Sequence, residues 1–196
     1  MQQILIERRG LLPAFGAAVT TYDAPTGAHC DRVARSAVAL GRALQLSTSD
    51  LAALSWGGAL HDVGKLAVAE DILAKDGPLL PEEWQEIQRH PDVGADLLLA
   101  VSPELTPIAG IVRAHHERWD GTGYPHGTAG EETPLLGRLV AVVDAFDAMI
   151  STRQYHPRMT PTEALEELTR HAGSQFDPVM VESFTVLYRR GQVPLS

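Results

Sequence analysis

Apolar residues recur along most of this chain at every third or fourth position, which is the spacing of one face of an α-helix. Between residues 27 and 46, for example, they fall at Val33, Ala37, Leu40 and Leu44. Alternation of apolar and polar residues, which marks a half-buried β-strand, never persists beyond a few positions. The pattern predicts an all-α fold, and 196 residues are enough for one domain with its own core.

Prolines, glycines and capping residues divide this pattern into separate helices. The run Ser47-Thr-Ser-Asp50 is typical of a helix start, and Pro81 and Pro91 suit the first turn of a helix. Residues 120–134 contain four glycines and two prolines, which predicts an ordered loop. The predicted helices are residues 27–46, 51–60, 81–90, 91–100, 103–118 and 135–151, followed by two that start at Thr160 and Asp177.

The charge and composition of the chain limit the classes of partner and the cellular compartment that we expect for it. A formal net charge of −9 argues against duplex nucleic acid as the partner, because that ligand requires basic surface. The single cysteine, Cys30, excludes an intrachain disulfide and suits a reducing compartment. No signal peptide starts the chain, and no apolar run is long enough to span a membrane. These features predict a cytoplasmic protein that binds neither duplex nucleic acid nor membrane.

Polar residues interrupt the predicted helices at a few positions where burial would be unfavourable. His61-Asp62 and His115-His116 are adjacent pairs, and Asp144 lies within the apolar run LVAVVDAFDAMI. A lone histidine in such a place is usually a surface residue or a hydrogen-bonded core residue. Buried imidazoles and carboxylates are costly unless they are paired or bind a metal, so the two pairs together favour one metal site. Imidazole mixed with carboxylate suits iron, manganese or zinc better than magnesium.

The number of candidate ligands favours two metal ions over one. Seven ligand groups are too many for a single ion. If Asp62 and a hydroxide both bridge two octahedral ions, about ten of twelve positions are filled, and roughly two remain for phosphate oxygens. The candidate ligands are His29, His61, Asp62, His90, His115, His116 and Asp144.

Two short motifs resemble the signatures of a known family. HDVGK at 61–65 resembles the signature of the HD phosphohydrolase superfamily, and HHERWDGTGYP at 115–125 matches the HHExxDGxGYP signature of the HD-GYP subfamily at every fixed position. The resemblance covers nearly the whole chain after about residue 20. It implies an HD-domain-like helical bundle with an ordered GYP loop over residues 21–196, preceded by a short helical extension over residues 1–20.

The resemblance also assigns the candidate ligands to two metal ions. Members that bind a third ion carry a glutamate where this chain has Pro25, so two ions are expected here. Iron or manganese is the preferred assignment, with zinc, nickel or magnesium as alternatives. By the resemblance, the first ion is held by His29, His61, Asp62 and Asp144, and the second by Asp62, His90, His115 and His116.

Further residues gain expected roles from the family. Asp62, Lys65 and Asp147 are the expected catalytic residues: Lys65 would contact the phosphate and assist the leaving oxygen. Asp147 would orient a ligand or the hydroxide, with a surface acid as the alternative. Gln154 and His156 replace a proline and a cation of the family's pattern, so affinity or base preference is expected to differ. The expected substrate contacts are Lys65, Gly123, Tyr124, Pro125, Arg153 and His156.

The activity that the resemblance implies is hydrolysis of cyclic di-GMP to pGpG, GMP or both, by a hydroxide activated by two metals. One alternative is a phosphodiesterase for another cyclic dinucleotide, such as cyclic GMP-AMP. Another is a non-catalytic cyclic di-GMP receptor or docking module. The GYP loop is also a candidate docking site for a diguanylate cyclase or another partner. For the Gly-Tyr-Pro tripeptide itself, a purely structural role is the alternative to direct contact with the ligand. A homodimer is a further expectation.

Overall fold

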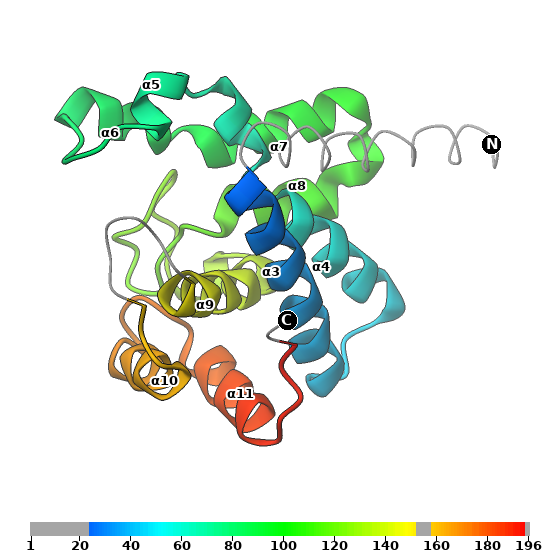
Figure 1. Cartoon of the computed structure of the whole chain (residues 1–196). Helices are drawn as coiled ribbons and strands as arrows, with labels where there is room; N and C mark the ends of the chain where they lie inside the picture. The colour runs from blue at the N-terminus through cyan, green and yellow to red at the C-terminus, as the bar shows by residue number, and fades with distance from the viewer. Residues whose placement is uncertain (1–23, 152–157, 195–196) are drawn as a thin grey trace.

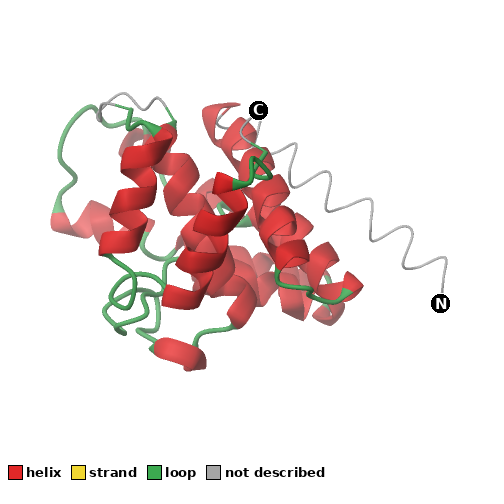
Figure 2. Cartoon of the chain, turned by 90° about the horizontal axis from the view of Figure 1, so that it is seen from below, coloured by secondary structure: helices red, strands yellow, loops and turns green. Residues whose placement is uncertain are grey.

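The computed structural model describes residues 24–151 and 158–194, and these residues form a helical bundle (Figure 1). No strand occurs within these ranges, where the only bridge pairs Ala172 with Phe176, so the all-α prediction is confirmed (Figure 2). The helices are α3 (Ala24–Ala43), α4 (Thr48–Leu60), α5 (Glu70–Leu73), α6 (Pro81–Ile87), α7 (His90–Val101), α8 (Thr106–Ala114), α9 (Leu135–Ile150), α10 (Pro161–Arg170) and α11 (Pro178–Arg189). Three 3₁₀ turns, η1 (Val63–Ala67), η2 (Pro103–Leu105) and η3 (Gly130–Glu132), connect them.

The centre of the bundle is the packing of α3 against α4; α9 packs against α3, α8 packs against α4, and α8 and α9 also contact each other (Figure 1). A Cβ atom at Gly58 would lie 2.7 Å from Cα of Ala34, so α3 and α4 approach closely at this glycine. The apolar faces that predicted the helices supply the core, including Leu40, Leu54 and Phe146. No helix among the described residues has both the length and the apolar character to cross a bilayer.

Several helices begin where the sequence predicts, and their caps explain why. The hydroxyl of Ser47 accepts a hydrogen bond from the backbone N–H of Asp50 at the start of α4. Thr160 and Glu163 form a reciprocal capping box at the start of α10. The carboxylate of Asp177 caps α11 by accepting from the backbone N–H of Val179. Each cap satisfies backbone donors that a helix leaves free at its N-terminus.

One predicted helix boundary is wrong in a way that matters for function. The helix predicted over residues 103–118 ends at Ala114, after beginning as a 3₁₀ turn. His115 and His116 therefore occupy the turn that follows α8 rather than its interior. The chain then enters an irregular segment over residues 120–134, as predicted, with one short 3₁₀ turn. The predicted extension over residues 1–20 lies outside the described residues.

A close approach at Gly64 joins η1 to α7. A Cβ atom at this position would overlap the carbonyl oxygen of His90 and lie 2.7 Å from the backbone nitrogen of Gly94. Because both neighbours are backbone atoms, no side-chain rotation could relieve the overlap. The glycine of the HDVGK motif is thus required by packing, and it keeps Asp62 close to the start of α7.

We expect Gly64→Ala to lower the free energy of unfolding by about 3 kcal/mol, because the backbones of η1 and α7 must separate to admit the methyl group. The matched control is Gly110→Ala, inside α8, where an added Cβ meets nothing within 4 Å. The control should be neutral or stabilising by up to about 1 kcal/mol, since alanine favours the helix. Urea denaturation of both variants measures the difference, and equal stabilities would contradict this account of Gly64.

Candidate metal centre

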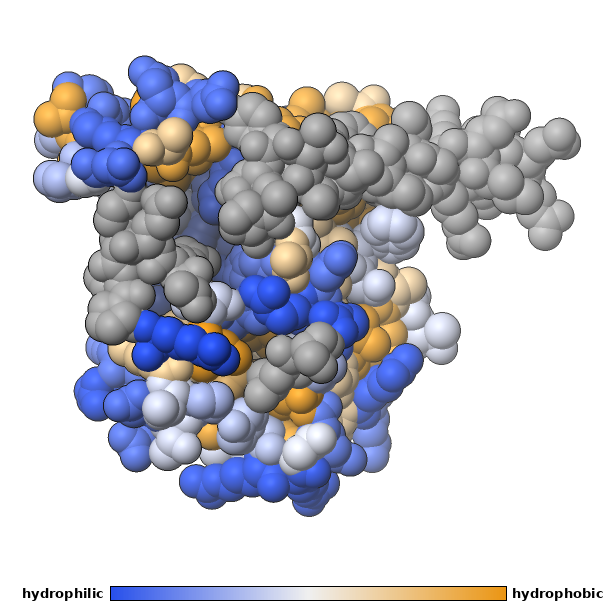
Figure 3. All heavy atoms as spheres, viewed as in Figure 1, coloured by the Kyte–Doolittle hydropathy of each residue, from blue (hydrophilic) through white to orange (hydrophobic). Residues whose placement is uncertain are grey.

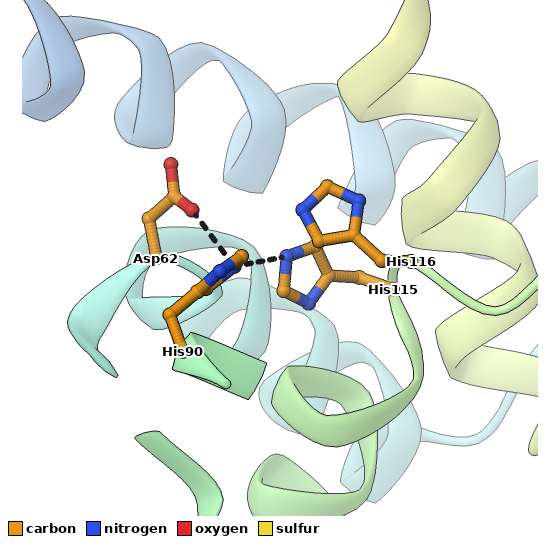
Figure 4. Close-up of side chains that lie close together, drawn as sticks. All are labelled: Asp62, His90, His115 and His116. Carbon is orange, nitrogen blue, oxygen red and sulfur yellow. Dashed lines mark hydrogen bonds and ion pairs between the residues drawn. The ribbon is translucent and has the colours of Figure 1, made fainter. Parts of the chain in front are cut away.

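The ends of α4 and α8, the start of α7 and the interiors of α3 and α9 bring together all seven predicted ligand residues. His29 lies in α3, and His61 and Asp62 follow the last residue of α4. His90 starts α7, the pair of histidines at 115 and 116 follows α8, and Asp144 lies within α9. Figure 4 shows the side chains of Asp62 and three of these histidines directed toward one another.

Asp62 belongs to two groups of potential ligands. Its carboxylate, His90, His115 and His116 offer donor atoms that lie within 4.8 Å of one another, and so do Asp62, His29 and His61. The Oδ1 atom of Asp62 lies 3.4 Å from Nε2 of His90, whereas Oδ2 lies 3.5 Å from Nε2 of His61. The two oxygens therefore face different groups, which is the arrangement of a bridging carboxylate.

Asp144 completes the group around His29. Its Oδ1 atom lies 2.9 Å from Nε2 of His29 and 3.7 Å from Nε2 of His61. Burial raises the pKa of Asp144, but the hydrogen bond from His29 and the nearby imidazoles outweigh burial and hold this pKa well below its usual value. The carboxylate is therefore ionised at neutral pH, which is the form that binds a cation.

Three of the imidazoles are oriented by backbone carbonyl groups. The Nδ1 atoms of His61, His90 and His115 lie 2.8, 2.7 and 2.6 Å from carbonyl oxygens three residues earlier in the chain. A carbonyl oxygen only accepts hydrogen bonds, so each Nδ1 carries the proton. In the neutral ring the Nε2 lone pair then points into the cluster, as in protein metal sites. The acceptors belong to Gly58, Ile87 and Val112.

The donor set fits a divalent cation. The Nε2 atoms of His90 and His115 lie 3.3 Å apart, and neither can donate to the other while both Nδ1 atoms hold the protons (Figure 4). Burial lowers the pKa of His90 to about 4 and that of His115 well below its usual value. Burial also lowers the pKa of His116 to about 4. The three rings are neutral at pH 7, and a cation would satisfy their facing lone pairs.

His29 and His61 differ from these three rings because they lie closer to carboxylates. Burial lowers the pKa of His29, but its hydrogen bonds to Asp144 and Asp147 outweigh burial and raise this pKa to about 9. Burial also lowers the pKa of His61, and the charge of Asp62 contributes most to raising it to about 9. In the metal-free chain both nitrogens of each of these two rings carry a proton at pH 7, so each ring is positively charged. A bound cation would displace one proton from each ring.

Asp147 supports His29 from behind. It is buried, with 6% of its surface exposed, and its Oδ2 accepts a hydrogen bond from Nδ1 of His29 at 2.6 Å. Arg32 binds the same carboxylate through two hydrogen bonds of 2.8 Å, and Ser151 donates a third at 3.1 Å. Burial raises the pKa of Asp147, but the bonds from His29 and Arg32 lower it to about 2.

Arg32 and Ser151 were not among the residues predicted from the sequence. Arg32 follows His29 by three positions and Ser151 follows Asp147 by four, so each lies one helical turn from a predicted residue. That spacing is the signal that could have identified them. Lys65, which was predicted, places Nζ 2.8 Å from Oδ2 of Asp62 at the edge of the cluster.

The GYP loop packs directly against the cluster. The ring of Tyr124 stacks on His116, with centroids 4.7 Å apart and planes at 29°. A Cβ atom at Gly123 would overlap the backbone of Arg118 and lie 2.6 Å from the carbonyl oxygen of His116, so packing alone requires glycine there. Pro125 follows Tyr124 through a cis peptide bond. Of the other predicted substrate contacts, Arg153 and His156 lie outside the described residues.

Glu117 holds this loop in place, a role that the sequence analysis did not assign. Its buried carboxylate accepts hydrogen bonds from the backbone N–H groups of His126, at 2.8 Å, and Thr128, at 3.2 Å. Arg118 binds Asp120 on the outer side of the same loop. The acid that follows the two histidines of the motif therefore orders the loop.

A cavity of about 450 Å³ opens beside the cluster. Predicted residues on its wall include Lys65, Gly123 and Tyr124, whereas Pro125 does not contribute to the lining. The lining residues are His29, Asp62, Lys65, Trp84, Gln88, His115, His116, Glu117, Arg118, Thr122, Gly123, Tyr124, Ala141, Asp144, Ala145, Ala148, Gln175 and Phe176. The cavity therefore gives a ligand access to candidate metal ligands of both groups.

Comparison with known proteins agrees with the fold and the motifs. The chain is 37% identical to the 3′3′-cGAMP-specific phosphodiesterase 2 of Vibrio cholerae over 84% of its own length and 32% of that protein. It is 34% identical to the cyclic di-GMP phosphodiesterase response regulator RpfG of Xanthomonas campestris, over 93% of this chain and 49% of the relative. A cyclic di-GMP phosphodiesterase of Thermotoga maritima is 36% identical over 86% of this chain and 48% of that protein.

A solved structure shares the arrangement of helices. The cyclic GMP-AMP-specific phosphodiesterase V-cGAP3 of V. cholerae superposes with a TM-score of 0.66 at 22% identity, over 84% of this chain and 44% of that chain. The chain thus spans about a third to a half of the length of these proteins. The family model described as HD domain matches residues 17–180. With this match and both signature motifs, the chain belongs to the HD domain family and to its HD-GYP group.

Proposed function

We propose that this chain is a metal-dependent phosphodiesterase that hydrolyses cyclic di-GMP to pGpG, GMP or both. The observation that carries the proposal is Asp62, whose two oxygens face two separate groups of metal-binding side chains beside an open cavity. The names of the relatives support the reaction class, because they are cyclic di-GMP and 3′3′-cGAMP phosphodiesterases.

The side chains in the cluster would hold the metal ions. Asp62 would be shared between them, with His29, His61 and Asp144 on one side and the remaining histidines on the other. Iron or manganese suits the mixture of neutral imidazoles and carboxylates, and zinc, nickel and magnesium are the alternatives. Bound divalent ions supply Lewis-acid activation of water and of the phosphoryl oxygen in this class of hydrolysis.

The other residues would act on the substrate or on the ligands. Lys65 sits at the cavity wall with Nζ near Asp62, where its charge would bind phosphate and stabilise the departing 3′ oxygen. Asp147 does not line the cavity, and we assign it to positioning His29 rather than to contact with the substrate. Gly123 and Tyr124 would shape the wall on which the substrate rests.

A second candidate function keeps the reaction and changes the substrate to cyclic GMP-AMP. This alternative is kept because relatives named for either substrate have similar sequence identity to the chain. The identity is 37% for the 3′3′-cGAMP-specific phosphodiesterase and 34% for the cyclic di-GMP phosphodiesterase RpfG. Competition between the two labelled substrates would decide between them. A non-catalytic receptor is less favoured, because the full set of predicted ligands converges here. Docking of a diguanylate cyclase at the GYP loop, a homodimer and a cytoplasmic location stay predictions.

Replacing both His61 and Asp62 with alanine should remove bound metal and lower hydrolysis of cyclic di-GMP by about a thousandfold or more, equivalent to about 4 kcal/mol in the barrier. Anaerobic assays with added Fe(II) or Mn(II), separation of products by chromatography, and elemental analysis measure both effects. The matched control replaces another neighbouring histidine and acid, His171 and Glu167, which pair on α10 and its C-cap away from the cavity. Hydrolysis retained in the first variant would refute the assignment.

Asp147→Asn should weaken metal binding and hydrolysis by about 10- to 100-fold, the usual effect of removing a partner that orients a histidine ligand. The neutral amide would hold Nδ1 of His29 less strongly and would lose the ion pair with Arg32. Metal titration monitored by calorimetry measures the affinity. Asp96→Asn, on the exposed face of α7, is the control and should change neither property. Unchanged metal affinity in Asp147→Asn would show that this carboxylate does not position the ligand.

A further inference from the structure

Helix α6 presents two side chains to the cavity that the metal centre does not use. Trp84 and Gln88 are four residues apart, so they lie on the same face of the helix, and both line the cavity. Trp84 keeps 46% of its surface exposed. A large aromatic ring exposed at the wall of a cavity offers a stacking surface to a planar ligand.

Trp84 continues an aromatic series that begins at the metal centre. Tyr124 stacks on His116, and the ring centroid of Trp84 lies 6.3 Å from that of Tyr124 at an angle of 75°. The indole therefore contacts the GYP tyrosine, which itself stacks on a candidate metal ligand. A planar ligand attached to a phosphate near the metals could reach it.

Gln88 offers the polar counterpart to this ring. Its side-chain amide has no hydrogen-bond partner among residues 24–151 and 158–194, although the side chain is half-buried at the cavity wall. An amide carries both donors and an acceptor. It can therefore form hydrogen bonds with the edge of a base that presents both kinds of group, as purines do.

We propose that Trp84 and Gln88 form a nucleobase subsite, in which the indole stacks on a purine and the amide binds the edge of the base. The inference rests on the proposed function, because a cyclic dinucleotide brings bases to the cavity together with the phosphate. Stacking on aromatic side chains is the common way in which proteins hold unpaired bases. The subsite would supply affinity for the base, separate from the chemistry at the metals.

A different use of the same helix is a docking surface for another protein. Leu80, the N-cap of α6, is 50% exposed, and Figure 3 shows apolar surface at this end of the molecule. Leu80 does not line the cavity, whereas Trp84 and Gln88 both do. The position of these two side chains therefore favours a ligand inside the cavity over a partner that covers the outside of α6.

The test compares binding of GMP with binding of ribose 5-phosphate, which lacks the base, to the metal-loaded protein by calorimetry. The wild type should prefer GMP by about 10- to 100-fold, the contribution expected from one stacked base. In Trp84→Ala this preference should fall by about tenfold or more, through loss of GMP affinity alone. Trp84→Phe should retain part of the preference, and Gln88→Leu should lower the affinity for GMP several-fold without changing the affinity for ribose 5-phosphate.

The matched control is Trp56→Ala, on α4, whose tryptophan does not line this cavity and whose loss should leave the preference unchanged. An undiminished preference for GMP in Trp84→Ala, or no preference in the wild type, would overturn the subsite. The first of these results would leave the Leu80–Trp84 surface as a docking site. Hydrolysis of cyclic di-GMP by the wild type, measured in parallel, tests the proposed function separately. Trp84-dependent GMP binding without hydrolysis would refute the function and keep the subsite.

Discussion

The arrangement of the whole site depends on the need to stabilise ionisable side chains within an apolar bundle. Asp62, His61, His90 and His115 are almost fully buried. Burial alone would keep such groups uncharged or would unfold the helices that carry them. Asp62 overcomes this cost because Lys65 and the surrounding imidazoles lower its pKa well below the usual value, although burial opposes them. One carboxylate thereby holds both halves of the cluster together.

Helix ends supply the second part of this stabilisation. An α-helix leaves the carbonyl groups of its last turn without partners inside the helix. His61 and His115 are the C-cap residues of α4 and α8, and each donates to a carbonyl three residues earlier in its own helix. His90 does the same with Ile87, the last residue of α6. The free carbonyls and the ring N–H groups satisfy one another, so each ring is oriented by its own segment of chain.

The sequence predicted the helical class and most helix starts, because periodicity and capping are local signals. The two motifs and the wider family resemblance also named the seven side chains that the structure brings together as candidate ligands. It did not predict the end of α8 at Ala114, since residues 115–118 carry no proline or glycine that would mark a stop. Glu117 fell within the helix predicted over residues 103–118, yet its partners are backbone N–H groups of a loop that only folding brings near. Contacts between distant segments, such as Gly64 with His90, likewise leave no trace in spacing.

The carbonyl of Ile87 has a mechanical consequence for this site. It belongs to the same short helix as Trp84, and it is the acceptor that sets the orientation of the His90 ring. A ligand that shifts α6 must therefore also move the acceptor of His90. By thermodynamic reciprocity, a cation that fixes His90 would equally bias the position of α6. A ligand bound beside Trp84 and a cation bound at His90 would then both depend on the position of α6. The coupling between them would pass through a single turn of this helix.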